Sequence, residues 1–235
     1  MQIVRNRPKY LTRSAEPTLI QDVELMRHLG NHRTIPKNGL HVDVPVEYFA
    51  KILYAAYTNE ILNRGKKMIL TPELEKNIWA ISRYLTTPNY RLGIFLAGPV
   101  GNGKTTMLHA IRETFYFLAE TDRKVVEHTG IFNGCPIITA KEICKEYIAT
   151  ACTYLHRDFL MIDDIGHEAT EWNDYGSIKT PIIDFIEMRY ARLKYMFASS
   201  NLSTQDIGRK YGQRISDRLD DMMFLIDFTD DSFRE

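Results

Sequence analysis

The first stretch of the chain with the residue types and spacing for chemistry is glycine-rich and contains one lysine. It reads GPVGNGKTT over residues 98–106 and fits the pattern G-x-x-x-x-G-K-[ST]. Glycines let the backbone wrap closely, so that its N–H groups and the start of the next helix face phosphate oxygens. An ordinary strand-to-helix turn is the alternative. We interpret the stretch as a phosphate-binding loop whose ATP contacts are Gly98, Pro99, Val100, Gly101, Asn102, Gly103, Lys104, Thr105 and Thr106.

Within this loop, two side chains have specific expected roles. Lys104 is expected to reach the β- and γ-phosphates, and the hydroxyl of Thr105 to bind Mg²⁺.

Two aspartates, Asp163 and Asp164, end the apolar run FLMIDD, and open α/β sheets bind ligands at this end of their strands. Asp163 is expected to hold Mg²⁺ through water, and Asp164 to orient or deprotonate the attacking water. Alternatively, both aspartates only cap the strand.

A third polar position follows another apolar run, in the stretch ASSN. Asn201 ends this stretch, on a strand that we expect between the strand before the glycine-rich loop and the strand before the aspartates. There its amide would face the γ-phosphate or the attacking water. Ser-Ser-Asn is also a common turn, which is the alternative interpretation.

Two arginines four residues apart lie in the segment YGQRISDRLDD and share a helix face. Arg214 and Arg218 could belong to a solvated helix and pair with Asp217, Asp220 and Asp221. The functional alternative is an arginine finger, which enters the ATP site of a neighbouring subunit and neutralises charge in the transition state. Spacing alone favours the solvated helix.

Alternating apolar runs and amphipathic stretches supply the elements that must position these residues. This alternation predicts an α/β fold with a parallel sheet, because buried parallel strands are continuously apolar and helices connect them. Two helices are expected before the sheet, one over 46–61 and one capped by Thr71 with Pro72 in its first turn. The five expected strands are 92–97, 135–139, 158–163, 195–199 and 222–228.

Composition narrows the class of protein without identifying a partner. The 235 residues are 44% apolar, and 30 basic residues balance 30 acidic ones, so net charge indicates neither nucleic acid nor membrane. The three scattered cysteines suit a reducing compartment. No apolar run approaches the roughly 20 residues of a membrane span, and we expect a cytoplasmic protein without a membrane partner.

Taken together, the motifs resemble those of the AAA+ ATPases of the DnaC/IstB group, over residues 71–235. GPVGNGKTT is similar to their Walker A motif, LMIDDIG to Walker B and SSN to sensor 1. YGQRISDRL resembles the segment with their arginine finger, which implies Arg218 as the finger and Arg214 as its companion. FTDDSFRE resembles the segment with the sensor 2 arginine, which implies the same role for Arg234.

The resemblance also implies an architecture. We expect a P-loop NTPase of the AAA+ type, a three-layer sandwich with a five-stranded parallel sheet and no C-terminal helical lid. A small helical N-terminal region, residues 1–65, would precede the ATPase domain, residues 66–235, and could bind a partner. Subunits of a homo-oligomer would place each ATP between one phosphate loop and Arg218 of the next subunit.

Function is also implied by the resemblance. The leading hypothesis is an ATP-hydrolysing, DnaC-like loader that acts on a replicative DNA helicase and on single-stranded DNA. An IstB-like ATPase that regulates a transposase is the alternative, and a P-loop kinase for a small molecule is a third. Candidate DNA contacts, unless their segment is an ordinary amphipathic helix, are Lys141, Lys145, Tyr147, Tyr154 and Arg157.

Overall fold

A computed structural model describes residues 39–122, 124, 134–149, 153–174 and 177–230. All of these residues belong to one compact unit, which begins at Asn38. Residues 1–38 of the expected helical N-terminal region and the expected sensor 2 residue Arg234 lie outside the described residues. Among the described residues, no helix is both long and apolar enough to cross a bilayer.

The sheet has five parallel strands, as the alternating pattern predicted. Its strand order is β2-β3-β6-β1-β7, so the strand that ends near Asn201 lies between the other two motif strands, as expected. Apolar side chains dominate all five strands, and β1 is buried at every position. The strands are β1 (Gly93–Ala97), β2 (Ile137–Thr139), β3 (Phe159–Ile165), β6 (Tyr195–Ser200) and β7 (Met223–Asp227).

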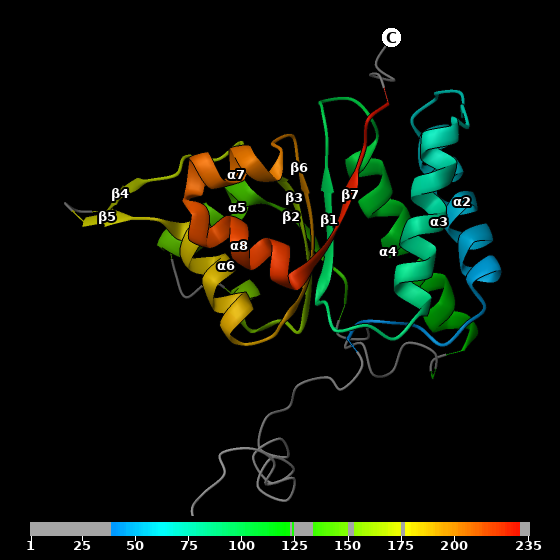
Figure 1. Ribbon diagram of the computed structural model, residues 1–235, viewed down its shortest axis with the longest axis horizontal. Coiled ribbons are helices and arrows are strands. Elements are labelled where there is room, and N and C mark those ends of the chain that lie inside the picture. The colour runs from blue at the N-terminus through cyan, green and yellow to red at the C-terminus, as the bar shows by residue number, and fades with distance from the viewer. Residues whose placement is uncertain (1–38, 123, 125–133, 150–152, 175–176, 231–235) are drawn as a thin grey trace, which may run out of the picture. The chain divides into compact units, whose positions relative to one another are not determined.

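Helices cover both faces of this sheet, which gives the predicted three layers (Figure 1). On one face lie α2 (Val46–Asn63), α3 (Pro72–Thr86) and α4 (Lys104–Thr121). On the other face lie α5 (Ala140–Ala149), α6 (Pro181–Ala191), α7 (Thr204–Tyr211) and α8 (Gln213–Met222). This arrangement follows from the sequence, because strands that are apolar throughout must be covered on both sides.

Helix α3 begins as its sequence predicted. Thr71 is the N-cap and its hydroxyl accepts a hydrogen bond from the backbone N–H of Leu74, with Pro72 at the first helical position. The helix buries Leu74, Ile78, Ile81 and Leu85 in the core.

Helix α2 packs directly on α4, the helix that follows the glycine-rich loop. Phe49 and Leu53 of α2 are fully buried. The ring of Phe49 packs edge-on against the ring of Phe115 of α4, with the two ring centroids 6.3 Å apart. Residues 38–235 therefore form one compact unit that includes α2. The domain boundary that we expect at residue 65 differs from this grouping, because α2 shares the hydrophobic core of the ATPase fold.

One feature differs from the pattern-based expectation. A short antiparallel hairpin, β4 (Trp172–Asp174) and β5 (Ser177–Lys179), follows β3 and was not predicted. A 3-10 helix, η4, covers Thr153–His156. After β7, the described residues 228–230 contain no helix.

Candidate nucleotide-binding site

The glycine-rich loop connects the buried strand β1 to the start of α4, as a phosphate-binding loop must. Gly103 lies in the left-handed region with φ of 92°, and a Cβ there would be 2.2 Å from the hydroxyl oxygen of Tyr57. Burial, with a contribution from the charge of Asp230, raises the pKa of Tyr57 to about 12. The phenol therefore stays neutral beside the loop, and its position excludes any side chain at residue 103.

Lys104 lies inside the turn of this loop. Its ammonium group donates hydrogen bonds to the carbonyl oxygens of Gly98 at 2.6 Å and Pro99 at 2.7 Å, and to Oδ1 of Asn102 at 3.0 Å. The Asn102 amide in turn donates to the carbonyl oxygen of Phe228 at 2.6 Å. Through these bonds, Asn102 fixes the loop to the end of β7 and orients the lysine.

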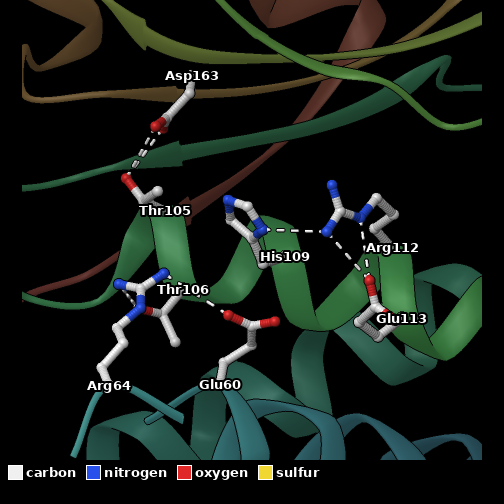
Figure 2. A network of polar contacts seen from close by, with 8 residues as sticks. All are labelled: Glu60, Arg64, Thr105, Thr106, His109, Arg112, Glu113 and Asp163. Carbon is white, nitrogen blue, oxygen red and sulfur yellow. Dashed lines mark hydrogen bonds and ion pairs between the residues drawn. The ribbon is translucent and has the colours of Figure 1, made fainter.

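Thr105 and Asp163 meet at the carboxyl ends of β1 and β3. The Thr105 hydroxyl lies 3.0 Å from one carboxylate oxygen of Asp163 and 3.1 Å from the other (Figure 2). Ser199, which was not predicted to take part, donates a hydrogen bond from its hydroxyl to the same carboxylate. Hydroxyl and carboxylate oxygens are ligands that Mg²⁺ prefers, so the two predicted metal-site residues fit this ion.

Asp164, next to Asp163 near the end of β3, contacts a residue that follows the neighbouring strand β6. A register shift between Ile162 and Ile165 bends the end of β3, and Asp164 adopts a left-handed conformation with φ of 62°. Such a conformation is uncommon for a residue with a side chain and occurs often at functional sites. The Asp164 carboxylate accepts a hydrogen bond from the amide of Asn201 at 3.1 Å, so the structure brings these two predicted site residues together.

One pocket of about 1000 Å³, large enough for a nucleotide, is lined by the loop from Val100 to Thr106 and by Asp164, His167 and Asn201. The remaining wall comes from α2 and the segment that follows it, which sequence reasoning did not assign to the site. That wall consists of Tyr57, Ile61, Arg64, Lys66, Lys67 and Ile69.

Arg64, a member of this wall, forms a hydrogen bond with a residue of the glycine-rich loop. Its Nη1 donates to the Thr106 hydroxyl at 3.2 Å, and its Nη2 lies 3.7 Å from the Glu60 carboxylate (Figure 2). Thr106 follows the expected metal ligand Thr105, so Arg64 lies beside the phosphate-binding turn. The basic run NRGKK at 63–67 was a signal that could have identified this wall.

Replacing Arg64 with alanine should weaken the binding of ATP and ADP alike, by about tenfold, because a charge-assisted hydrogen bond to a shared phosphate would be lost. The maximal rate of hydrolysis should stay within about twofold, since Arg64 lies on the α2 side of the loop, away from Asp164. Calorimetric titrations with both nucleotides measure the effect. The control is Arg83→Ala, an exposed arginine on α3. A loss restricted to ATP would contradict this role.

The two arginines of the predicted finger do not line the pocket of their own chain, as far as the described residues show. Arg218 lies 2.7 Å and Arg214 lies 3.0 Å from the same carboxylate oxygen of Glu187 on α6. The guanidinium of Arg218 also lies over the ring of Tyr190, 5.2 Å from its centroid. The acidic partner of the pair is therefore Glu187 of another helix, and not the aspartates of α8.

The candidate DNA contacts do not form one exposed group. Lys141 and Lys145 on α5 and Arg157 after η4 are exposed. Tyr154 instead packs partly buried against the hydrophobic core, which supports the amphipathic interpretation for that residue. The side chain of Tyr147 lies outside the described part of the chain.

Fold and site together define a P-loop protein with a central parallel sheet. No family model matches the sequence, and no curated protein matches it. Solved structures do match. DnaI aligns over 81% of this chain and 97% of its own, with 21% identity and a TM-score of 0.52. A putative primosome component from Streptococcus pyogenes serotype M3 aligns over 86% and 97%, with 16% identity and a TM-score of 0.50.

The particular fold is therefore the three-layer sandwich around a five-stranded parallel sheet that the sequence motifs predicted, and DnaI and the putative primosome component share it. The DnaC helicase loader is also among the matches, with 18% identity, a TM-score of 0.47, and coverage of 73% of this chain and 98% of its own. At these identities the likeness is one of fold.

Proposed function

We propose that this protein binds and hydrolyses ATP with Mg²⁺. The observation that carries the proposal is that the glycine-rich loop, with Thr105, lines one nucleotide-sized pocket together with Asp164 and Asn201, while Asp163 lies against the Thr105 hydroxyl. Asp163 and Asp164 lie near the end of β3, Asn201 follows β6, and Thr105 lies in the first turn of α4, at the carboxyl edge of the parallel sheet. Such an edge is where open α/β sheets bind ligands.

Each residue has a separate task in this reaction. Lys104 binds the β- and γ-phosphates, and Thr105 and Asp163 hold Mg²⁺, which neutralises phosphate charge when bound. Asp164 orients the attacking water and accepts its proton. Asn201 holds Asp164 through its amide and places a second polar group beside the γ-phosphate.

We further propose that the ATPase acts in DNA replication as a DnaC-like loader of a replicative helicase on single-stranded DNA. Similarity in fold to DnaI and to a putative primosome component supports this role. Arg218 would act in trans between subunits of a homo-oligomer, since it does not line the pocket of its own chain in the described residues. An IstB-like transposase regulator shares all these features and is the alternative, whereas a kinase gives the Arg214–Arg218 pair no role.

Nucleotide binding is tested by Lys104→Ala. The variant should bind ATP about 10- to 100-fold more weakly, because it loses charge-assisted contacts to two phosphates. Titration calorimetry in the presence of Mg²⁺ measures the affinity, and circular dichroism confirms that the fold is retained. The control is Lys76→Ala, an exposed lysine on α3 that forms an ion pair with Glu73 of the same helix. Equal ATP affinity in Lys104→Ala and wild type would refute the proposed site.

The biological partner is tested by purification of the protein from its native cells with a slowly hydrolysed ATP analogue. Recovery of a hexameric helicase supports the loader. Recovery of an integrase-like transposase supports the IstB-like alternative and contradicts the loader.

A further inference from the structure

His167 lies in the nucleotide pocket, close to the side chains proposed to activate water. It follows β3 by two residues and lines the pocket together with Asp164 and Asn201. Its ring Nε2 lies 2.8 Å from the amide nitrogen Nδ2 of Asn201. The same Nδ2 atom lies 3.1 Å from the carboxylate of Asp164. One amide group therefore bridges a carboxylate and an imidazole.

The donors and acceptors in this trio can be assigned from chemistry. A carboxylate only accepts hydrogen bonds, so the Asn201 atom that faces Asp164 must be the NH₂ group. That group has two hydrogens, and the second is directed to Nε2 of His167. Nε2 must then be an acceptor, which requires a neutral ring with its proton on Nδ1. With both hydrogens engaged, the Asn201 amide cannot rotate without losing two bonds.

The backbone around His167 is fixed by several buried contacts. The His167 N–H donates to the carbonyl oxygen of Asp164 at 3.3 Å, which closes the turn after β3. Glu168, only 4% exposed, accepts a hydrogen bond from the Gly166 N–H at 3.0 Å and another from the Tyr211 hydroxyl. Burial, together with this bond to Glu168, raises the pKa of Tyr211, so the phenol remains a donor. The ring is thus presented from an anchored turn.

The strand that carries Asn201 is anchored to the same turn. The Ser200 hydroxyl donates to the carbonyl oxygen of Ile165 at 2.6 Å and accepts from the Leu202 N–H at 3.0 Å. The buried bond between Ser200 and Ile165 therefore joins the two segments that carry Asn201 and His167. This arrangement suits a residue that controls orientation, because positioning requires a rigid support.

We propose that His167 is a positioning residue for ATP hydrolysis, which orients the Asn201 amide and, through it, the Asp164 carboxylate. This inference rests on the proposed ATPase function. His167 accepts one amide hydrogen, which directs the other to Asp164 and holds that carboxylate in the orientation needed by the attacking water. It contributes to the rate of hydrolysis and leaves nucleotide affinity unchanged.

Steady-state kinetics of the full chain test this role. His167→Ala should lower kcat about tenfold, the size expected for loss of one hydrogen bond, with the Kd for ATP within about twofold of wild type. His167→Gln should recover kcat to within about threefold, because its amide oxygen can accept at the position of Nε2. His156→Ala is the matched control, an exposed histidine near the opposite end of the same strand, and should behave as wild type.

A direct readout is the ring tautomer, measured by ¹⁵N-resolved NMR of the imidazole nitrogens above pH 8. Wild-type His167 should carry its proton on Nδ1, and Asn201→Ala should shift that proton toward Nε2. The imidazole signals that are present in wild type and missing in His167→Gln belong to His167, which assigns them among the seven histidines. An Nε2–H tautomer in wild type, or a kcat of His167→Ala equal to wild type, overturns the inference and leaves the ATPase proposal intact. Absence of ATP turnover in the wild-type oligomer overturns both.

Discussion

Replacing Arg218 with alanine is expected to lower ATP turnover by about 10³-fold or more, while ATP affinity stays within about twofold. The reason is that Arg218 does not line the pocket of its own chain in the described residues, so it can stabilise transition-state charge only at a neighbouring subunit's site. Turnover at saturating ATP and a binding titration separate the two effects.

Mixed subunits provide the decisive control for this prediction. Arg218→Ala subunits keep an intact phosphate loop, and Lys104→Ala subunits keep an intact arginine. Mixing the two inactive variants should therefore restore part of the activity. The absence of rescue at every mixing ratio, with full turnover in a monomeric wild-type sample, would contradict action in trans.

A substitution of Glu187 tests the same role of Arg218, but it is expected to raise turnover instead of lowering it. Its carboxylate oxygen lies 2.7 Å from Arg218 in the single chain, so the arginine must leave this ion pair to reach a neighbour. A partly exposed pair of this kind contributes up to about 1 kcal/mol, and Glu187→Gln should raise turnover at limiting subunit concentration by about threefold. Unchanged turnover across a concentration series would show that the pair does not compete with assembly.

Gly93→Ala is expected to be the most destabilising single substitution considered, with a loss of about 4 kcal/mol or more. A Cβ at this position would lie 1.6 Å from the carbonyl oxygen of Met196 on the adjacent strand. Neither strand can move away freely, because β1 is paired with β6 on one side and with β7 on the other. Thermal unfolding should therefore begin roughly 10 °C lower, if the variant folds at all.

Gly208→Ala is the matched control for this substitution. Gly208 lies within α7, and a Cβ there would be no closer than 3.4 Å to a neighbouring atom, Oε1 of Gln213. Alanine in a helix interior should stabilise the protein by up to about 1 kcal/mol relative to glycine. If Gly93→Ala melts at or above the wild-type temperature, then β1 and β6 do not lie as close together at Gly93 and Met196 as described here.

Much of the site could be predicted because its parts are local in sequence. The spacing of Gly98, Gly103 and Lys104 specifies a loop that closes on itself, and such a loop depends on neighbouring residues only. Apolar runs followed by polar residues mark strand ends, and parallel strands place those ends at one edge of the sheet. For this reason the fold class, and the position of the strand before Asn201 between the other two motif strands, followed from the sequence.

Other contacts depend on how distant segments pack, and no local pattern encodes them. Tyr57 and Arg64 reach the phosphate loop only because α2 packs on α4, and that packing is decided by shape and burial across the whole core. The ion-pair partner of Arg218 is Glu187. Glu187 lies on α6, and β6 and α7 separate this helix from α8, which carries Arg218.

The sequence by itself determined that this protein has a glycine-rich loop between a strand and a helix, acidic strand ends and a parallel sheet, because residue type and spacing fix local backbone geometry. The tertiary structure decided which side chains complete the pocket, with His167 bonded to Asn201 and Ser199 bonded to Asp163. Hydrogen bonds of this kind require atoms within about 3 Å. Only the packed strand order brings residues more than 30 positions apart so close.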